Sequence, residues 1–248
     1  MNIKIVLGAI GCVFVFSSNV SASQWSLGVS TSYSPAVYKD TESNVVTIPM
    51  IGYEGDHLFF NGFSAGYRIF PRRSQQNLIL RVVYDPRTLK PEDSTDSDIQ
   101  KLDERKAAVL GGVTYQLISL VGIFEFSVGS DIGHTHDGVY AETVWKLPIY
   151  QQNWAIIPSI GYNYSGEKIN NHLYGVSTSE AARTTFDEFD AGWNGKIFAG
   201  LSGYMQLTKR TRITGSIRYT NLEGDLEQSP IVKSGINTSA TIGIAYIF

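Results

Sequence analysis

The length, hydropathy and charge of this chain argue against two broad classes of protein. Its 248 residues include 17% charged side chains and have a mean hydropathy of −0.06. No run of about 18 apolar residues follows the N-terminal segment, which argues against membrane-spanning helices. The formal net charge is −3 and the basic residues form no cluster, so we expect no nucleic-acid partner. A transmembrane β-barrel stays open, because its strands alternate lipid-facing and lumen-facing residues.

The N-terminal segment has the three parts of a secretion signal. Lys4 gives the positive start, and residues 5–16 form an apolar stretch that is too short to span a bilayer. Val20 and Ala22 are small residues, as required at the third and last positions before a cleavage site. We therefore predict export from the cytoplasm and cleavage between Ala22 and Ser23.

This cleavage would divide the chain into a signal peptide, residues 1–22, and one mature domain, residues 23–248. The single cysteine, Cys12, lies in the signal, so the mature domain has no thiol for a disulfide or a Cys-based site. Lipid attachment at Cys12 is the alternative interpretation. The residues after Cys12 are apolar, however, where a lipoprotein continues with a polar tether.

From Ser23 onward the apolar residues recur at every second position, which is the signature of β-strands. No helical periodicity persists after the signal peptide, and we find no internal repeat. The pattern therefore predicts an all-β domain. The alternating runs cover residues 25–33, 46–50, 78–84, 109–115, 120–128, 139–147, 154–162, 197–205, 213–219 and 242–248.

The predicted connections alternate in length along the chain, as they do in outer-membrane barrels with short periplasmic turns and longer outer loops. This alternation predicts twelve strands with both termini in the periplasm. On one side we expect 34–44, 61–62, 86–104, 132–138, 165–192 and 223–235, and on the other 54–57, 71–76, 117–119, 149–152 and 208–210.

One predicted hairpin fits this scheme poorly. Residues 57–60 are fewer than the about 9–11 that a membrane strand needs. Asn61-Gly62 is nevertheless a strong hairpin signal, so we keep the two strands that flank it. A barrel of ten strands is the alternative.

The C-terminal strand is the sharpest indication of an outer-membrane barrel. Ala240, Ile242, Ile244, Tyr246 and Phe248 occupy every second position, and the chain stops on the aromatic residue. This is the pattern that the barrel-assembly machinery is expected to read. A terminal strand of a soluble sandwich is the alternative. We expect a Gram-negative outer membrane, where lipid and lipopolysaccharide surround the barrel.

Five groups of short motifs follow one another in the second half of the chain. They are Asp131-Ile132-Gly133-His134-Thr135-His136-Asp137-Gly138, Leu173-Tyr174-Gly175-Val176 with Glu180-Ala181, Ala191-Gly192-Trp193-Asn194, Arg218-Tyr219 with Leu222, and Ser229-Pro230-Ile231-Val232. Together with the acidic segment Asp85 to Arg105, which contains Asp103-Glu104-Arg105, they resemble the MipA/OmpV family of outer-membrane proteins, whose name derives from MltA-interacting protein. The resemblance implies a non-enzymatic scaffold for murein synthesis and turnover, with a lytic transglycosylase and a murein synthase as partners.

Two other functions stay open. A narrow channel for small solutes would suit the charges of both signs that strand alternation directs into the lumen. A surface adhesin or receptor would use the long loops, and segment 165–192 could either plug the lumen or cap it. The charges predicted to face the lumen are Arg81, Glu125, Glu142, Lys146, Lys196, Arg212 and Arg218.

Two loop segments hold residues that could bind a metal, but we interpret both as polar loops. Residues 131–138 contain two histidines and two aspartates, yet a third well-placed ligand is not evident. Residues 91–98 are acidic but lack the glycine and the distal glutamate of an EF-hand loop. No Gly-x-Ser-x-Gly motif occurs. We expect no catalytic residue, cofactor or metal.

Overall fold

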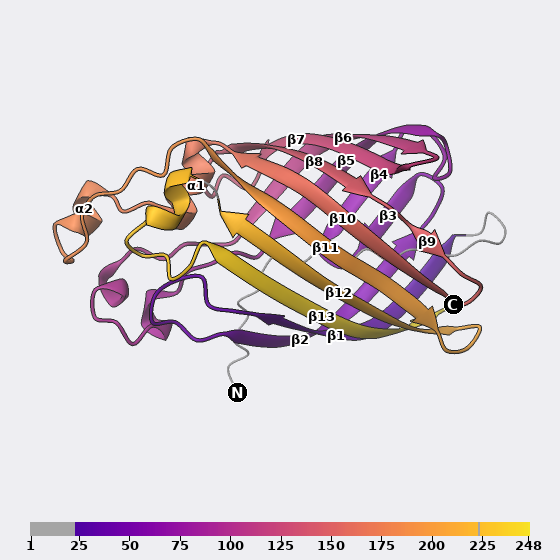
Figure 1. The fold of residues 1–248 in the computed structure, drawn as a ribbon, viewed down its shortest axis with the longest axis horizontal. Coiled ribbons are helices and arrows are strands. Elements are labelled where there is room, and N and C mark those ends of the chain that lie inside the picture. Colours follow the sequence, from indigo (N-terminus) through magenta and orange to yellow (C-terminus); the bar gives the residue numbers. More distant parts are fainter. Residues whose placement is uncertain (1–22, 223) are drawn as a thin grey trace.

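The chain forms a closed antiparallel β-barrel in a computed structural model that describes residues 23–222 and 224–248 (Figure 1). The predicted signal peptide, with Ala22 at its end, lies outside the described residues. The strands run β11-β12-β13-β1 and onward to β8 and β10, and a ladder between β10 and β11 closes the ring. Among the described helices, none is long and apolar enough to cross a membrane.

Twelve strands build the wall, which confirms the predicted number. The short strand β9 continues β8, since both pair with β10. The strands are β1 (Gln24–Ser34), β2 (Asn44–Glu54), β3 (Leu58–Asn61), β4 (Ser64–Arg68), β5 (Gln76–Asp85), β6 (Ala108–Ser119), β7 (Gly122–Asp131), β8 (Val139–Lys146), β9 (Ile149–Tyr150), β10 (Trp154–Ser165), β11 (Asn194–Gln206), β12 (Thr211–Leu222) and β13 (Ile236–Ile247).

The predicted C-terminal strand closes the seam with β1. Ile244 lies opposite Val29, and the Phe248 amide donates to the Trp25 carbonyl at 3.0 Å. Ile242, Ile244 and Tyr246 point outward and are exposed, whereas the residues between them are buried. Both ends of the described chain therefore lie together at one end of the barrel.

Every charged residue in the described strands faces the lumen, while the residues beside it on the strand face outward. This arrangement follows from the energy of transfer, because a charged side chain on the lipid face costs about 2–4 kcal/mol at the bilayer midplane. It confirms the seven lumen-facing charges expected from alternation and adds four. The set is Glu54, Arg68, Arg81, Asp85, Glu125, Asp131, Glu142, Lys146, Lys196, Arg212 and Arg218.

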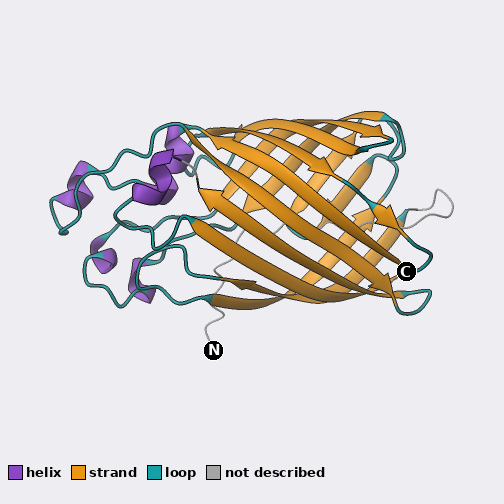
Figure 2. Ribbon diagram, in the orientation of Figure 1, coloured by secondary structure: helices purple, strands orange, loops and turns teal. Residues whose placement is uncertain are grey.

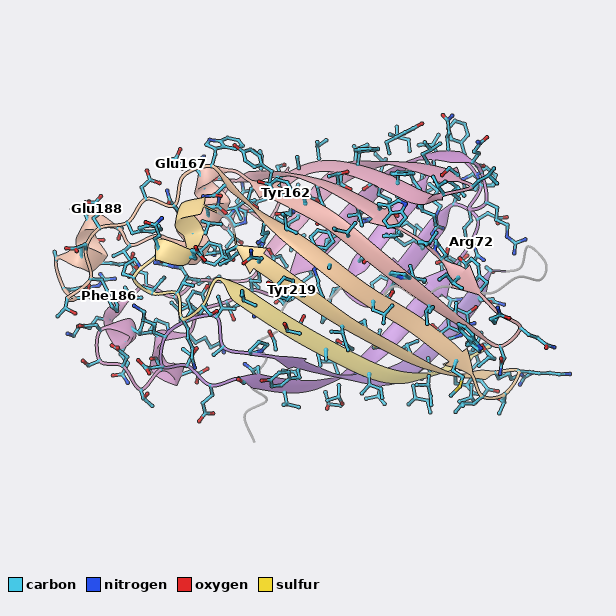
Figure 3. All side chains as sticks on the ribbon, viewed as in Figure 1. Arg72, Tyr162, Glu167, Phe186, Glu188 and Tyr219 are labelled. Atoms are coloured by element: carbon cyan, nitrogen blue, oxygen red, sulfur yellow. The ribbon has the colours of Figure 1, made fainter. Side chains whose placement is uncertain are left out.

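Aromatic side chains gather outside near both ends of the strands, as the two membrane interfaces require. At one end the Tyr164 and Trp193 rings lie 5.8 Å apart, and at the other Tyr246 and Phe248 lie 5.0 Å apart. Figure 3 shows Tyr219 and Tyr162 on the barrel wall. The outer surface between the two ends is apolar.

The two ends of the barrel differ in their connections (Figure 2). We call them the loop end and the turn end. The loop end holds the long connections and all the helices described: α1 (Glu167–Tyr174), α2 (Thr178–Ala181) and three short 3-10 turns, η1 (Pro91–Asp93), η2 (Ile99–Lys101) and η3 (Gly224–Gln228). The turn end holds 55–57, 69–75, 120–121, 151–153 and 207–210. The predicted alternation of long and short connections is thus confirmed.

The all-β prediction is confirmed for the barrel wall, and the loop end adds short helices that no periodicity had indicated. Helix α1 buries Ile169, Asn170, Leu173 and Tyr174 on one side. It has only eight residues, so it shows little more than one apolar pair at helical spacing, which periodicity cannot detect.

Candidate functional site

The long connections at the loop end fold together into a cap with its own small core. We define the cap as connections 35–43, 86–107, 166–193 and 223–235. An isolated bridge from Tyr38 to Val232 ties the first connection to the fourth, and two further bridges lie within single connections, 86–107 and 166–193. Figure 1 shows α1 over the barrel mouth and α2 further out. The long connection 166–193 therefore caps the barrel rather than filling it.

Two apolar clusters hold the cap. The first joins α1 to connection 223–235 and to the end of β12, and the second joins all four connections. Burial of this apolar area is what makes long connections order without a sheet. The first cluster contains Ile169, Leu173, Tyr174, Ala191, Leu222, Leu226 and Val232, and the second Tyr38, Leu89, Ile99, Leu102, Val176 and Ile231.

A buried ion pair joins the second and third cap connections. Arg105 donates to Glu180 at 2.7 Å and also to the Gly175 carbonyl at 3.1 Å. Glu180 is 1% exposed and accepts from the Asp103 amide. It also completes a capping box with Ser177 at the start of α2. The motif residues Gly175, Val176 and Glu180 are thus elements of cap structure.

Asn170 fastens the two ends of the long connection. Its side-chain amide donates to the carbonyls of Ser165 and Gly192 at 3.0 and 2.9 Å. Gly192 has φ +53°, a conformation that favours glycine. Trp193 next to it leaves the cap and stacks outside the barrel. The motif Gly192-Trp193 therefore turns the chain from cap to wall.

The Ser-Pro motif packs beneath α1. Ser229 donates to the Tyr174 carbonyl at 2.6 Å, and Ile231 is fully buried. The Lys39 amide donates to the Ile231 carbonyl at 3.0 Å, which draws connection 35–43 onto this segment. Pro230 stands between these two contacts.

A charged layer lies immediately under the cap. Arg87 pairs with Asp85 through two nitrogens, with distances of 2.9 and 3.0 Å from Nε. Burial disfavours the charged guanidinium, but the attraction of Asp85 outweighs it and raises the pKa of Arg87. Burial raises the pKa of Tyr38 and Tyr174, so both hydroxyls stay neutral. Lys196 Nζ lies 6.0 Å from the Tyr174 ring.

Arg218, the basic residue of the family motifs, belongs to the same region. Its guanidinium lies 3.6 Å from the centre of the Phe198 ring, a cation–π contact. Tyr219, next in sequence, points outward and is exposed. The motif Arg218-Tyr219 thus supplies one lumen group and one interface group.

Further polar networks occupy the lumen at two lower levels. In the middle, Glu125 accepts from Lys146 at 2.9 Å and from Gln116 at 3.0 Å. Near the turn end, Glu54 pairs with Arg68 at 2.8 Å. Charges of both signs therefore meet inside the barrel, where they satisfy one another away from lipid.

The histidine-rich loop is held by its own aspartates. Asp131 accepts from the amides of Gly133, His136 and Asp137. His134, which is exposed, bonds to Asp137 at 2.7 Å, and this bond raises its pKa. Across residues 23–222 and 224–248, no group of three His, Cys, Asp or Glu is placed to hold a metal.

The acidic segment 91–98 is likewise engaged in loop contacts. Asp96 accepts from the amides of Asp98 and Ile99 at 2.7 and 3.1 Å. Hydrogen bonds from Lys101 and Thr185 lower the pKa of Asp98. These contacts fix the segment against connection 166–193.

The turn end exposes both apolar and basic groups. Leu120 is 105% exposed and Val121 63% at the tip of the β6–β7 turn. Arg73 is exposed in the adjacent β4–β5 turn and Lys209 in the more distant β11–β12 turn, and Figure 3 places Arg72 at this end. By sequence, the turn-end connections carry four basic residues and one acidic, while those at the loop end carry nine basic and seventeen acidic. The molecule is therefore electrically polar along its axis.

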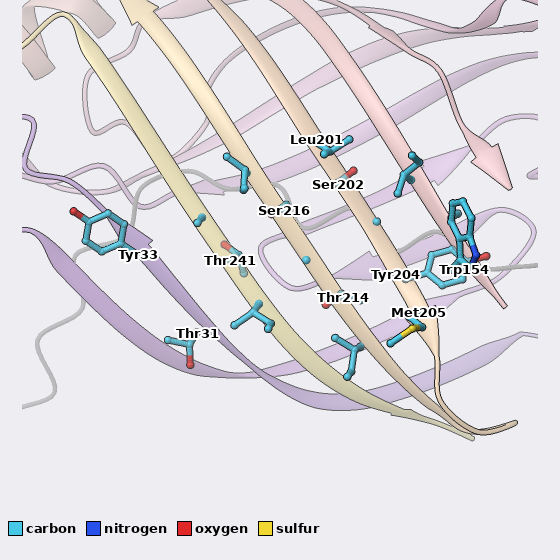
Figure 4. Close-up of a pocket in the computed structure, with 18 residues that line it drawn as sticks. Thr31, Tyr33, Trp154, Leu201, Ser202, Tyr204, Met205, Thr214, Ser216 and Thr241 are labelled. Carbon is cyan, nitrogen blue, oxygen red and sulfur yellow. The ribbon is translucent and has the colours of Figure 1, made fainter. Parts of the chain in front are cut away.

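A shallow groove of about 680 Å³ crosses the outer face over β10 to β13 (Figure 4). It forms where Gly203, Gly215 and Ala240 leave space between larger outward residues such as Leu201 and Ile217. The outward residues that line it are almost all apolar, so the groove faces lipid chains and offers little polar recognition.

The apolar band, the aromatic girdles and the charged lumen define an integral β-barrel of the outer membrane. The family model described as MltA-interacting protein MipA matches residues 27–248. The chain belongs to this family, as its motifs had indicated.

Individual relatives agree with this placement. MltA-interacting protein of Escherichia coli (strain K12) is 26% identical over 247 residues, covering 99% of each chain. Outer membrane protein OmpV of Vibrio cholerae is 25% identical over 226 residues, covering 91% of this chain and 87% of its own. Among solved structures, an outer membrane channel from Pseudomonas putida F1 gives a TM-score of 0.44 at 7% identity, covering 94% of this chain and 97% of that chain. The chain is an outer-membrane protein.

Sequence reasoning brought out Tyr174, Glu180, Ser229 and the segment that contains Arg105, but it gave no role to Asn170 or Arg87, which hold the same region. Arg105 contacts Glu180 across 75 residues of sequence, and Asn170 contacts backbone carbonyls, so neither contact has a local sequence signal. Arg87 pairs with the side chain of Asp85 two residues earlier. For Glu180 a signal existed, because Ser177-x-x-Glu180 has the spacing of a capping box.

Proposed function

We propose that this protein is a non-enzymatic scaffold that holds a lytic transglycosylase, and with it a murein synthase, at the periplasmic face of the outer membrane. The observation that carries the proposal is the family match over 27–248, together with the name of the E. coli relative. The proposal includes removal of residues 1–22 on export and folding by the barrel-assembly machinery, which would read Ile242, Ile244, Tyr246 and Phe248.

In this proposal the turn end, with both termini, faces the periplasm. Outer-membrane barrels place short turns there and long loops outside, where acidic loops meet lipopolysaccharide. The turn end is then the only surface that a periplasmic enzyme can reach. Its basic residues and the exposed Leu120-Val121 tip favour a partner with an acidic face and an apolar contact.

The test is capture of a purified lytic transglycosylase by the barrel in detergent. The double variant Arg73→Glu, Lys209→Glu reverses two exposed charges at the turn end. We expect binding to fall about tenfold or more, since each lost charge contact contributes on the order of 1 kcal/mol. Raised salt should weaken wild-type binding in the same direction.

Lys39→Glu with Lys168→Glu is the matched control, because it makes the same charge change on two exposed lysines of the cap. This control should bind as the wild type does. Equal loss in both double variants, or no loss in either, would contradict docking at the turn end. Transglycosylase that never binds the folded barrel would contradict the scaffold itself.

A further inference from the structure

The barrel wall is incomplete between β2 and β5. Strands β3 and β4 have four and five residues, whereas β2 and β5 have eleven and ten. The last bond from the β3–β4 turn to β2 runs from the Gly62 amide to the Ile51 carbonyl. Beyond it β2 continues through Asn44–Met50, about 24 Å along its axis. We call the space between Asn44–Met50, the turn Gly62-Phe63 and the end of β5 the notch.

The notch lies within the membrane, in the half nearer the loop end. Its rim is marked by Val45, which pairs with the outward Tyr33 of the aromatic girdle. Val45 is 66% exposed and Ile51 49%. Tyr84, outward on the opposite side of the notch, lies beside Phe63 with ring centres 5.6 Å apart and the ring planes tilted. Apolar residues thus surround the opening on its outer side.

The sequence of this part of β2 is typical of a strand at the edge of a sheet. Odd-numbered residues direct their backbone groups toward the notch, as the Ile51 carbonyl shows. Pro49 falls in that set, and proline is confined to edges because it has no N–H to donate. Across the residues that the structure describes, no strand pairs with Asn44–Met50 on this side.

An open edge cannot face hydrocarbon, because its amides and carbonyls would go unsatisfied. Such backbone occurs at membrane depth only where protein covers it or where it lines a hydrated cavity. Because no described strand pairs with Thr47 on this side, the edge indicates a hydrated opening that connects the lumen with the lipid interface.

The inner side of the notch changes from apolar to cationic. Strand alternation turns Val46, Ile48 and Met50 inward, whereas the neighbouring strand β1 presents serines. Further in stands Arg81, which pairs across the sheet with Gly66 and Gly112 and so has no large cross-strand neighbour.

Arg81 is also without a direct acidic partner in the described chain. Its Nε is buried and has no hydrogen-bond partner there. The nearby carboxylate of the middle network is already taken by a lysine at 2.9 Å. The apolar side chains of Val46, Ile48 and Met50 and the guanidinium of Arg81, which has no acidic partner among the described residues, are complementary in shape and charge to an acyl chain that ends in a carboxylic acid.

We propose that the notch is a lateral binding site for an anionic amphiphile, whose acyl chain lies over Val46, Ile48 and Met50 and whose acidic head reaches Arg81. The ligand enters sideways from the bilayer. This inference is separate from the scaffold proposal, and turn-end variants should leave it unchanged.

Opening to lipid is tested by a fluorescent label on Ile48→Cys, in a Cys12→Ser background, in bilayers with brominated acyl chains. The matched control is Ser216→Cys, also lumen-facing but in a continuous wall. We expect the Ile48 label to be quenched several-fold more than the Ser216 label and comparably to one on outward Ile51→Cys. Equal protection of both lumen labels would overturn the opening. Val46→Cys replaces Ile48→Cys if the latter fails to fold.

The head-group contact is tested with 11-dansylundecanoic acid and the protein purified from outer membranes. Arg81→Gln should weaken binding about tenfold, the effect of losing one charge-assisted contact. Arg218→Gln removes another lumen cation, on the opposite wall, and should leave binding unchanged. The methyl ester of the probe should bind as weakly to the wild type as the acid does to Arg81→Gln. Equal binding of acid and ester, or equal loss in both variants, would overturn the site. If the natural occupant is a bilayer lipid, anionic vesicles should compete with the probe and zwitterionic vesicles should not. If it is a free fatty acid, only laurate should compete with the probe.

Discussion

The loop end and the turn end join the same antiparallel strands, yet they do so in opposite ways. At the loop end, long connections bury two apolar clusters and an ion pair, so their polar groups are used within the cap. At the turn end, connections of a few residues leave Leu120, Val121 and several cations exposed. The loop end, with an apolar core of its own, forms a lid over the barrel. The turn end, with exposed apolar and basic side chains, is better suited to bind a partner. The comparison gives three tests, in order of decreasing effect.

Removing the buried carboxylate should have the largest effect. Glu180→Ala leaves Arg105 buried without its partner, which costs about 3–5 kcal/mol for pairs of this kind. We expect the cap to open while the barrel persists, so trypsin should cut after Lys101 and Arg183 at least a hundredfold faster. Barrel integrity is followed by heat-dependent migration on a gel. Glu180→Gln, which keeps the shape, should show a smaller acceleration; a trypsin-resistant Glu180→Ala would contradict the separate stability of the cap.

Acid should loosen one corner of the cap to an intermediate degree. The rings of His136 and His172 lie 5.4 Å apart, and burial lowers the pKa of both below the ordinary 6.5. The unfolded loop therefore binds more protons than the folded loop, and its stability is lost as pH falls below about 6.5. Amide exchange, corrected for intrinsic rates, should rise between pH 7 and pH 5 in 132–138 and α1.

The double variant His136→Gln, His172→Gln should remove this pH dependence. Carboxylates elsewhere in the cap titrate lower, near 4 in their unperturbed state. If the double variant kept the same rise in exchange, the histidines would not be its cause.

The smallest effect is expected at the turn end. Leu120→Ser with Val121→Ser changes two exposed side chains, so the free energy of unfolding should change by no more than about 0.5 kcal/mol per site. Denaturant titration of the refolded barrel measures it. Capture of the transglycosylase should nevertheless weaken under the scaffold proposal. A large loss of stability would show that this tip supports the fold and would weaken the contrast between the two ends.

The barrel wall could be predicted from sequence because the alternation of residues within each strand shows which face meets lipid and which faces the lumen. Alternation at Ile242, Ile244 and Tyr246 requires one apolar face, and Arg81 or Glu125 can only point away from it. Asn61-Gly62 identified the hairpin that makes twelve strands rather than ten. These signals are local, so a single sequence reveals them.

The cap could not be predicted in the same way, because its contacts are between distant segments. Arg105 and Glu180 are 75 residues apart, and nothing near either one indicates the other. Helix α1 depends on tertiary packing of Ile169 and Leu173 rather than on a long amphipathic repeat. The motifs that pointed to the family, such as Ser229-Pro230, therefore had no structural explanation until the four connections were seen together.

The short hairpin β3–β4 also means that the barrel is not equally tall around its circumference. A bilayer adapts to a low hydrophobic wall by thinning locally, at a cost of fractions of a kcal/mol per ångström. Lipid on the β2–β5 side should therefore be compressed relative to lipid beside β10–β13, whose strands have twelve or thirteen residues. We therefore expect a preferred tilt in the membrane, with lipid head groups closer to the barrel interior on the β2–β5 side.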